Sequence, residues 1–94
     1  MSKAIWKLAL VINGYQVAKI PKGSQLLTVQ MQGGEMCIWF VVKDLGKYSG
    51  SEALHISVVG TGHEVEEIPG EYLGTIQAIG GEFIGHVFTK RTEA

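Results

Sequence analysis

Two near copies of one short segment constrain the fold of this chain more than any other feature. TVQMQGGE at residues 28–35 returns as TIQAIGGE at residues 75–82. Both copies alternate apolar with polar residues, which is the side-chain period of a β-strand, and both contain Gly-Gly. A two-residue hairpin turn needs positive φ, and glycine reaches it without steric cost. The repeat therefore predicts two β-hairpins of the same design.

The predicted turns set the register, with Gln32 opposite Glu35 and Ile79 opposite Glu82. One face of each hairpin is then aliphatic and is expected to face the core. It carries Leu27, Val29, Met31, Met36, Ile38 and Phe40 in the first copy, and Ile76, Ala78, Phe83 and Val87 in the second.

The other face of each predicted hairpin carries a Thr-x-Gln strand opposite a large ring. Thr28 is expected opposite Trp39 in the first copy, and Thr75 opposite His86 in the second. Hairpin chemistry does not require this repetition. If the two hairpins lie in opposite sheets, the molecule has two similar outer faces.

A third hairpin is predicted over residues 4–12 and 15–19, because Asn-Gly is a strong two-residue turn signal. It would place Leu10 opposite Val17. A further strand is expected at residues 53–59, after a polar loop at residues 43–52. The chain is therefore expected to form a single all-β domain over residues 1–94, a small antiparallel β-sandwich or flattened barrel of about seven strands. Its three tight hairpins are expected to turn at Asn13-Gly14, Gly33-Gly34 and Gly80-Gly81.

Composition limits the classes of function. The net charge of −1 and the scattered Lys and Arg residues argue against general nucleic-acid binding. Cys37 is the single cysteine, so no internal disulfide forms and a reducing cytosol is the expected compartment. The apolar run near the N-terminus is too short for a membrane span and has no signal-cleavage site. Hydrophobic residues make up 46% of the chain and charged residues 18%, which favours a homo-oligomer.

The outer faces of the two hairpins are candidate binding surfaces. Trp39 carries this hypothesis, because indole rings are enriched at interfaces and ligand sites. Around it the candidates are Thr28 and Gln30, and on the second hairpin Thr75, Gln77 and His86. The alternative is that these residues are only solvent-tolerant strand residues. Cys37 alternates with apolar residues, which predicts a packed, unreactive thiol.

The segment VVGTGHEVEE at residues 58–67 is a second candidate site. The backbone around Gly60, Thr61 and Gly62 could present amides to an anion, and His63 could add a protonatable donor. Together with Trp39 or His86 this turn would line a cleft for a small anionic ligand such as a nucleotide. The alternative is a glycine turn with an exposed histidine, and the nearby glutamates oppose an anion.

No catalytic, metal-binding or cofactor-binding residues are predicted. The histidines, the cysteine and the carboxylates lack the spacings typical of metal sites. Cys37 has no base near it in the sequence. An enzyme is the third-ranked hypothesis, a nucleotide hydrolase that would depend on His63 with Glu64 or Glu66.

Five segments carry a resemblance to a known family. They are IPKGSQLLTVQ at residues 20–30, CIWFVV at 37–42, VVGTGHEV at 58–65, YLGTIQ at 72–77 and GGEFIGHVF at 80–88. Nearly the whole chain resembles a small domain of unknown function that is encoded by tailed bacteriophages and prophages. The resemblance implies a phage origin, a compact β fold and action inside the infected bacterium, and it supplies no catalytic residues.

These observations predict a phage accessory protein that binds without turnover in the host cytoplasm. The expected partner is a host-defence nucleotide signal, which the protein would sequester, or a host protein, which it would inhibit. No membrane association is expected. The alternative function is a minor structural or assembly component of the phage particle, in which case the protein would be located in the virion.

Overall fold

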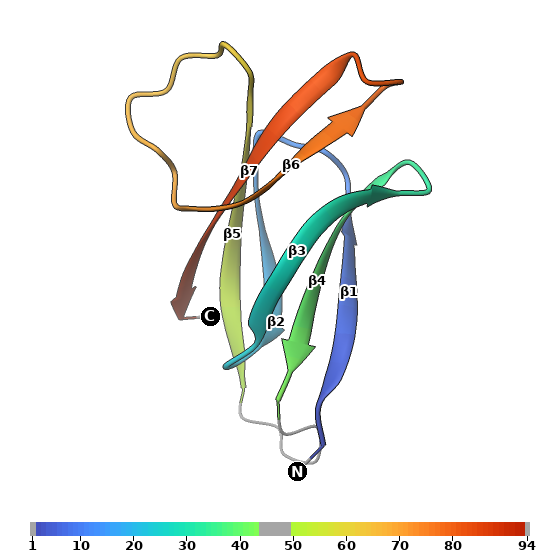
Figure 1. The fold of residues 1–94 in the computed structure, drawn as a ribbon. Coiled ribbons are helices and arrows are strands. Elements are labelled where there is room, and N and C mark those ends of the chain that lie inside the picture. The colour runs from blue at the N-terminus through green and yellow to red at the C-terminus, as the bar shows by residue number, and fades with distance from the viewer. Residues whose placement is uncertain (1, 44–49, 94) are drawn as a thin grey trace.

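Seven β-strands form two antiparallel sheets in the computed structural model, which describes residues 2–43 and 50–93 (Figure 1). The strands are β1 (Ala4–Leu10), β2 (Tyr15–Pro21), β3 (Gln25–Gln32), β4 (Glu35–Val42), β5 (Ser51–Gly60), β6 (Glu71–Ala78) and β7 (Phe83–Glu93). One sheet has three strands in the order β1-β4-β3, and the other has four in the order β2-β5-β7-β6. The predicted all-β sandwich is confirmed. Most of the predicted polar loop, at residues 44–49, lies outside the described residues.

The two copies of the repeat form hairpins in different sheets. β3 and β4 pair in the three-stranded sheet with Thr28 opposite Trp39, and β6 and β7 pair in the four-stranded sheet with Thr75 opposite His86. Each hairpin also has a register shift near its start, after Leu26 in β3 and after Tyr72 in β6. The repeated sequence therefore encodes a repeated, bulged hairpin. Gln32 lies opposite Glu35 as predicted, whereas the second ladder ends at Ala78 opposite Phe83, so Ile79 and Glu82 belong to a four-residue connection rather than to a tight two-residue turn.

The third predicted hairpin is wrong. β1 pairs with β4 and β2 pairs with β5, so Leu10 lies opposite Met36, and Val17 lies opposite His55. Asn13-Gly14 instead belongs to a connection that leads from one sheet to the other, where the Gly14 carbonyl accepts a hydrogen bond from Val58 N. The Asn-Gly preference is local. Pairing with long central strands gives β1 and β2 more hydrogen bonds and more burial than pairing with each other.

The core lies between the two sheets and draws on both. Its buried side chains are Ile20, Val29, Met36, Ile38, Phe40, Val42, Leu54, Ile56, Ile76 and Val87. Leu27 is a predicted core residue that is 43% exposed, because the bulge of β3 falls between Leu26 and Thr28 and Leu26 packs against the core in its place.

The sheets approach each other closely where β3 and β6 lie side by side (Figure 1). At this seam a Cβ on Gly74 would lie 2.8 Å from Cγ1 of Val29. Only a residue without a side chain fits there unless Val29 shifts.

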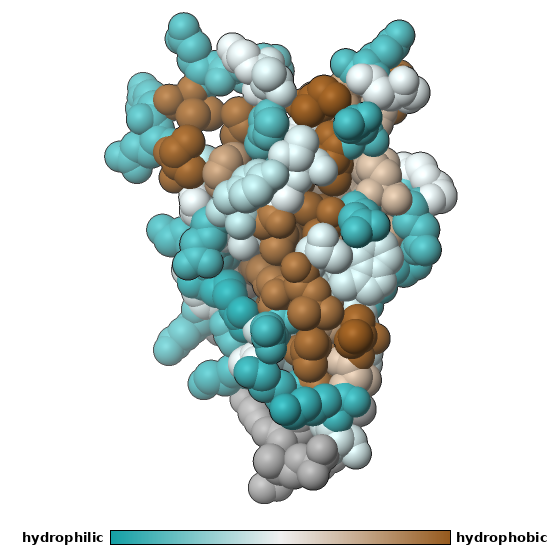
Figure 2. Space-filling view, in the orientation of Figure 1, coloured by the Kyte–Doolittle hydropathy of each residue, from teal (hydrophilic) through white to brown (hydrophobic). Residues whose placement is uncertain are grey.

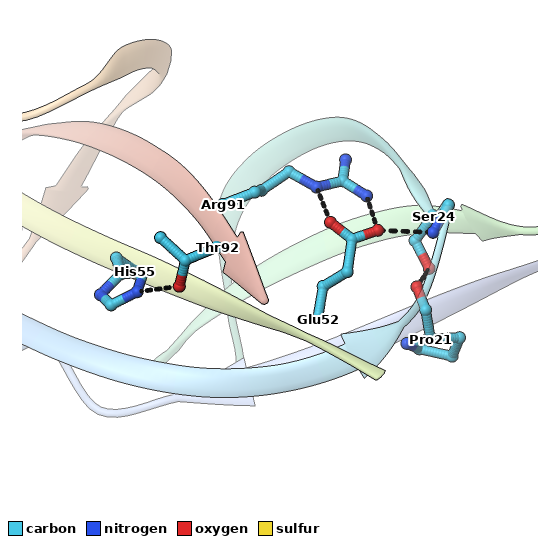
Figure 3. A network of polar contacts seen from close by, with 7 residues as sticks. Pro21, Ser24, Glu52, His55, Arg91 and Thr92 are labelled. Atoms are coloured by element: carbon cyan, nitrogen blue, oxygen red, sulfur yellow. Dashed lines mark hydrogen bonds and ion pairs between the residues drawn. The ribbon is translucent and has the colours of Figure 1, made fainter. Parts of the chain in front are cut away.

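A polar network ties the connection between β2 and β3 to the four-stranded sheet (Figure 3). Arg91 of β7 donates two 3.1 Å hydrogen bonds to the Glu52 carboxylate of β5, and Gly23 N donates a third at 2.6 Å. Ser24 Oγ donates to the Pro21 carbonyl at 2.6 Å. The Arg91 bonds, with that of Gly23, hold the pKa of Glu52 below its usual value, because they stabilise the charged carboxylate.

Candidate functional site

The predicted site residues fall into two groups on different sheets. Thr28, Gln30 and Trp39 lie on the outer face of the three-stranded sheet. The other seven belong to the four-stranded sheet or to the loop that leaves β5. The outer faces of a sandwich point in opposite directions, so the two groups do not form one site. Of the two rings proposed to line a cleft with the Gly60–His63 turn, Trp39 lies on the wrong sheet.

A side-chain hydrogen bond crosses the outer face of the three-stranded sheet. Lys7 Nζ of β1 donates a 2.7 Å hydrogen bond to Gln32 Oε1 of β3, and this bond spans β4. Trp39 lies between Lys7 and Thr28 in register and is half-buried. Cys37 is 1% exposed, which confirms the predicted packed thiol.

A chain of side-chain hydrogen bonds fixes His86 on the outer face of the four-stranded sheet. Thr61 Oγ1 lies 2.7 Å from His86 Nε2, and Thr75 Oγ1 lies 3.1 Å from His86 Nδ1. The hydroxyl of Tyr72 lies 2.5 Å from Thr75 Oγ1. Both ring nitrogens of His86 are therefore held by threonine hydroxyls, which fixes the orientation of the imidazole ring.

A cavity of about 250 Å³ lies beside His86. It is lined by Val59, Gly60, Thr61, Gly62, His63, Val65, Ile68, His86 and Phe88. Five of the predicted site residues thus meet at one cavity. Thr75 does not line it but holds the ring of His86, which does. Gln77 lies further along β6, opposite Ile84. The walls are mostly apolar with two imidazole rings, and the volume suits one planar ring rather than a large ligand.

The Gly60–His63 turn contributes a side chain to this cavity rather than a row of amide donors. Thr61 N donates to the Ile84 carbonyl at 3.2 Å, and His63 N donates to the Gly60 carbonyl at 3.1 Å. A Cβ on Gly60 would lie 2.9 Å from the His63 ring, so glycine is what allows the imidazole to pack against the end of β5. Because two amides of the turn are already hydrogen-bonded within the protein and both nitrogens of His86 are held by threonines, the imidazole of His63 is the protonatable group that the cavity offers to an anion.

The apolar walls of the cavity were not predicted from the sequence. Phe88 follows His86 by two residues in β7, so strand alternation alone places it on the same outer face. Val65 and Ile68 lie among the glutamates of residues 61–70, where no periodic signal marks them. Figure 2 shows apolar side chains over this loop, next to hydrophilic ones, and a broader apolar band down the middle of the same view.

Three aromatic side chains and one serine form a row across the outer face, next to the cavity. Tyr15, Ser57, Phe88 and Tyr72 are successive partners in register on the four strands. The Tyr72 and Phe88 rings pack edge to face with centroids 5.8 Å apart. Tyr15 stacks on His55, and its hydroxyl lies 2.6 Å from His55 Nδ1. This aromatic row was also missed, because it depends on pairing between strands that are distant in the sequence.

A larger, open groove of about 920 Å³ lies where β7 extends past the end of β6. It is lined by Gln25, Leu26, Glu67, Ile68, Pro69, Gly70, Glu71, Thr89, Lys90 and Arg91. Its charges are of both signs, and Arg91 is already bound to Glu52. The groove contains none of the predicted site residues.

The polar side chains at the cavity are imidazoles and a hydroxyl. Among residues 2–43 and 50–93, no three histidine, cysteine or acidic side chains lie close enough together to hold a metal ion. His86 is held on both nitrogens by hydroxyls, and these bonds orient its ring. Within the part of the chain that the structure describes, no helix is long and apolar enough to cross a membrane.

A domain of unknown function, DUF7352, matches the chain over residues 1–94. The chain belongs to this family. No curated protein and no solved structure matches it significantly.

Proposed function

We propose that this DUF7352 chain is a bacteriophage accessory protein that works by binding, without turnover, inside the infected bacterium. The motifs shared with phage-encoded domains support the origin. The observation that carries the binding function is the fixed His86 ring beside a mostly apolar cavity. A ring that is oriented before binding loses little freedom when a ligand packs against it.

The ligand class follows from the walls of the cavity. Phe88, His63 and His86 offer ring surfaces, and the Thr61 hydroxyl and the His63 imidazole offer hydrogen-bonding atoms. A nucleobase uses both kinds of contact, so we propose that the protein sequesters a host-defence nucleotide by holding one base in this cavity. The exposed glutamates at positions 64, 66 and 67 favour a second candidate, an aromatic side chain presented by a basic surface of a host protein.

Titration with a panel of cyclic and linear nucleotides tests the proposal. Calorimetry gives the affinity, and NMR follows the imidazole resonances of His63 and His86. We expect binding that His86→Ala weakens at least about fivefold, since loss of an aromatic contact costs about 1 kcal/mol or more. Gln30→Ala, on the outer face of the other sheet, is the matched control and is expected to bind like the wild type.

The outcomes separate the alternatives. If no nucleotide shifts the histidine resonances but a host protein is captured from infected cells and lost with His86→Ala, the host-protein candidate replaces the nucleotide. Detection of the chain by mass spectrometry of washed phage particles would instead favour the structural role. Nucleotide turnover that disappears with His63→Ala would overturn binding without catalysis.

A further inference from the structure

Each sheet of this sandwich has two edge strands, and three of the four edges carry features that discourage pairing with another chain. A free edge exposes backbone N–H and C=O groups that can extend the sheet, and proteins protect such edges with bulges, prolines, charges or neighbouring segments. β3 and β6 each contain a bulge and lie against each other. β2 contains Lys19 and ends at Pro21.

β1 is the least protected of the four edges among the described residues, with a single lysine and neither a bulge nor a proline. Its seven residues pair with β4 in one unbroken register from Ala4 to Leu10, and it contains no proline. Its one charge, Lys7, reaches across the outer face to Gln32 rather than along the edge. Ile5 is 64% exposed and Trp6 is 47% exposed, although both lie in the strand.

We propose that β1 pairs antiparallel with β1 of a second copy of this chain across a twofold axis. The two three-stranded sheets would then form one six-stranded sheet. A second copy suits this edge because a twofold interface must be self-complementary, and an apolar strand without acidic residues meets that condition. The net charge of −1 gives little repulsion between the copies.

Charge and side-chain size select the register. A twofold axis perpendicular to the sheet keeps the core-facing sides of both copies together, so residues of equal parity lie opposite each other. An axis at Lys7 would oppose two like charges directly, which is destabilising. An axis at Leu8 opposes Leu8 to Leu8 and Trp6 of one copy to Leu10 of the other. This register covers the exposed Trp6 ring with an aliphatic partner and leaves Lys7 beside Ala9.

Sedimentation equilibrium across a wide concentration range tests the association. We expect a monomer–dimer equilibrium whose dissociation constant rises at least about tenfold with Ala9→Lys, because in this register each new lysine would lie opposite Lys7 of the other copy. Val17→Lys also adds a lysine at an exposed apolar site, but on the β2 edge, and is the matched control that leaves the equilibrium unchanged. A wild-type protein that stays monomeric at every concentration would overturn the proposal.

Disulfide trapping tests the register independently of stability. Under mild oxidation Leu8→Cys is expected to form a covalent dimer, because the new thiols face each other at the axis. Val17→Cys, exposed on the β2 edge, is expected to stay monomeric. Circular dichroism of both variants is the check that each one folds. Equal trapping at positions 8 and 17 would indicate unspecific collision and contradict the proposal, and trapping of Trp6→Cys but not Leu8→Cys would contradict the register.

Discussion

The two copies of the repeat share a backbone design but differ in what surrounds them. In the first copy Trp39 lies half-buried beside Lys7 and Thr28, on an outer face that the Lys7–Gln32 hydrogen bond crosses. In the second, the equivalent His86 is held by hydroxyls and borders a cavity. The difference comes from the neighbouring strand, which is β1 in one sheet and β5 with its long following loop in the other. The repeat supplies a scaffold, and the adjacent segment makes the candidate site.

The largest expected effect concerns the position at which the copies differ most inside the core. Ile38 is fully buried in the first hairpin, whereas its counterpart in the second is Gly85. Ile38→Ala is expected to lower the free energy of unfolding by about 3 kcal/mol, because it removes buried methyl groups and leaves a cavity. Urea denaturation measures it. Leu27→Ala, at the exposed bulge, is the control and is expected to cost less than about 1 kcal/mol; equal costs would contradict the bulge.

The second test concerns the seam between the hairpins. Gly74→Ala is expected to lower the free energy of unfolding by about 2 kcal/mol, because its Cβ would lie 2.8 Å from Val29 Cγ1. In the double variant with Val29→Ala, the two costs should not add, since the smaller side chain removes the clash. Chemical denaturation of all four proteins gives the coupling energy. Simple additivity would show that the contact is not the cause.

A third, smaller effect concerns the network around Glu52. The pKa of this carboxyl is lowered in the folded protein, so its contribution to stability is present above the unfolded value of about 4.3 and is lost as pH falls through the folded pKa. Glu52→Gln is expected to cost about 1 kcal/mol near pH 7 and progressively less in acid. Urea denaturation across pH measures this. Glu64→Gln, in the exposed loop, should change little at any pH, and a constant Glu52→Gln cost would contradict the linkage.

The smallest effect compares equivalent threonines. Thr75→Val removes the hydroxyl that lies between His86 and Tyr72 and is expected to cost about 0.5–1 kcal/mol. It should also change the imidazole ¹⁵N shifts of His86, because one ring nitrogen loses its partner. Thr28→Val, opposite Trp39, is expected to cost less than about 0.5 kcal/mol and to leave the His86 signals in place. Identical spectra for both variants would contradict the hydrogen-bonded chain.

Local patterns predicted the parts of the fold that are themselves local. Strand alternation and Gly-Gly turns were sufficient for both repeated hairpins and for Thr75 opposite His86. The hairpin predicted around Asn13-Gly14 was wrong, because a turn preference cannot show that long-range pairing places β1 and β2 in different sheets. The core position predicted for Leu27 was wrong, because a bulge breaks the alternation of side chains and has no strong sequence signal of its own.

The candidate site divides in the same way. The glycine turn, His63 and His86 were identified from their residue types, and strand pairing brings them to one cavity. Trp39 could not be assigned to either side without knowing which sheet each hairpin joins. Val65 and Ile68 enter the cavity from an irregular loop, whose path no sequence period describes.

The pairing of β1 with β4 and of β2 with β5 has a consequence for biosynthesis. During translation the N-terminal strands are made first. β1 therefore has no pairing partner until residues 36–42 have been made, and β2 has none until residues 51–57 have been made. The β3–β4 hairpin is closed by a two-residue turn and can form as soon as it leaves the exit tunnel. β5 finds its second partner only after residues 85–93 of β7 have been made. Until these partners have been made, the apolar N-terminal strands of the nascent chain are exposed to aggregation unless chaperones bind them or translation proceeds quickly.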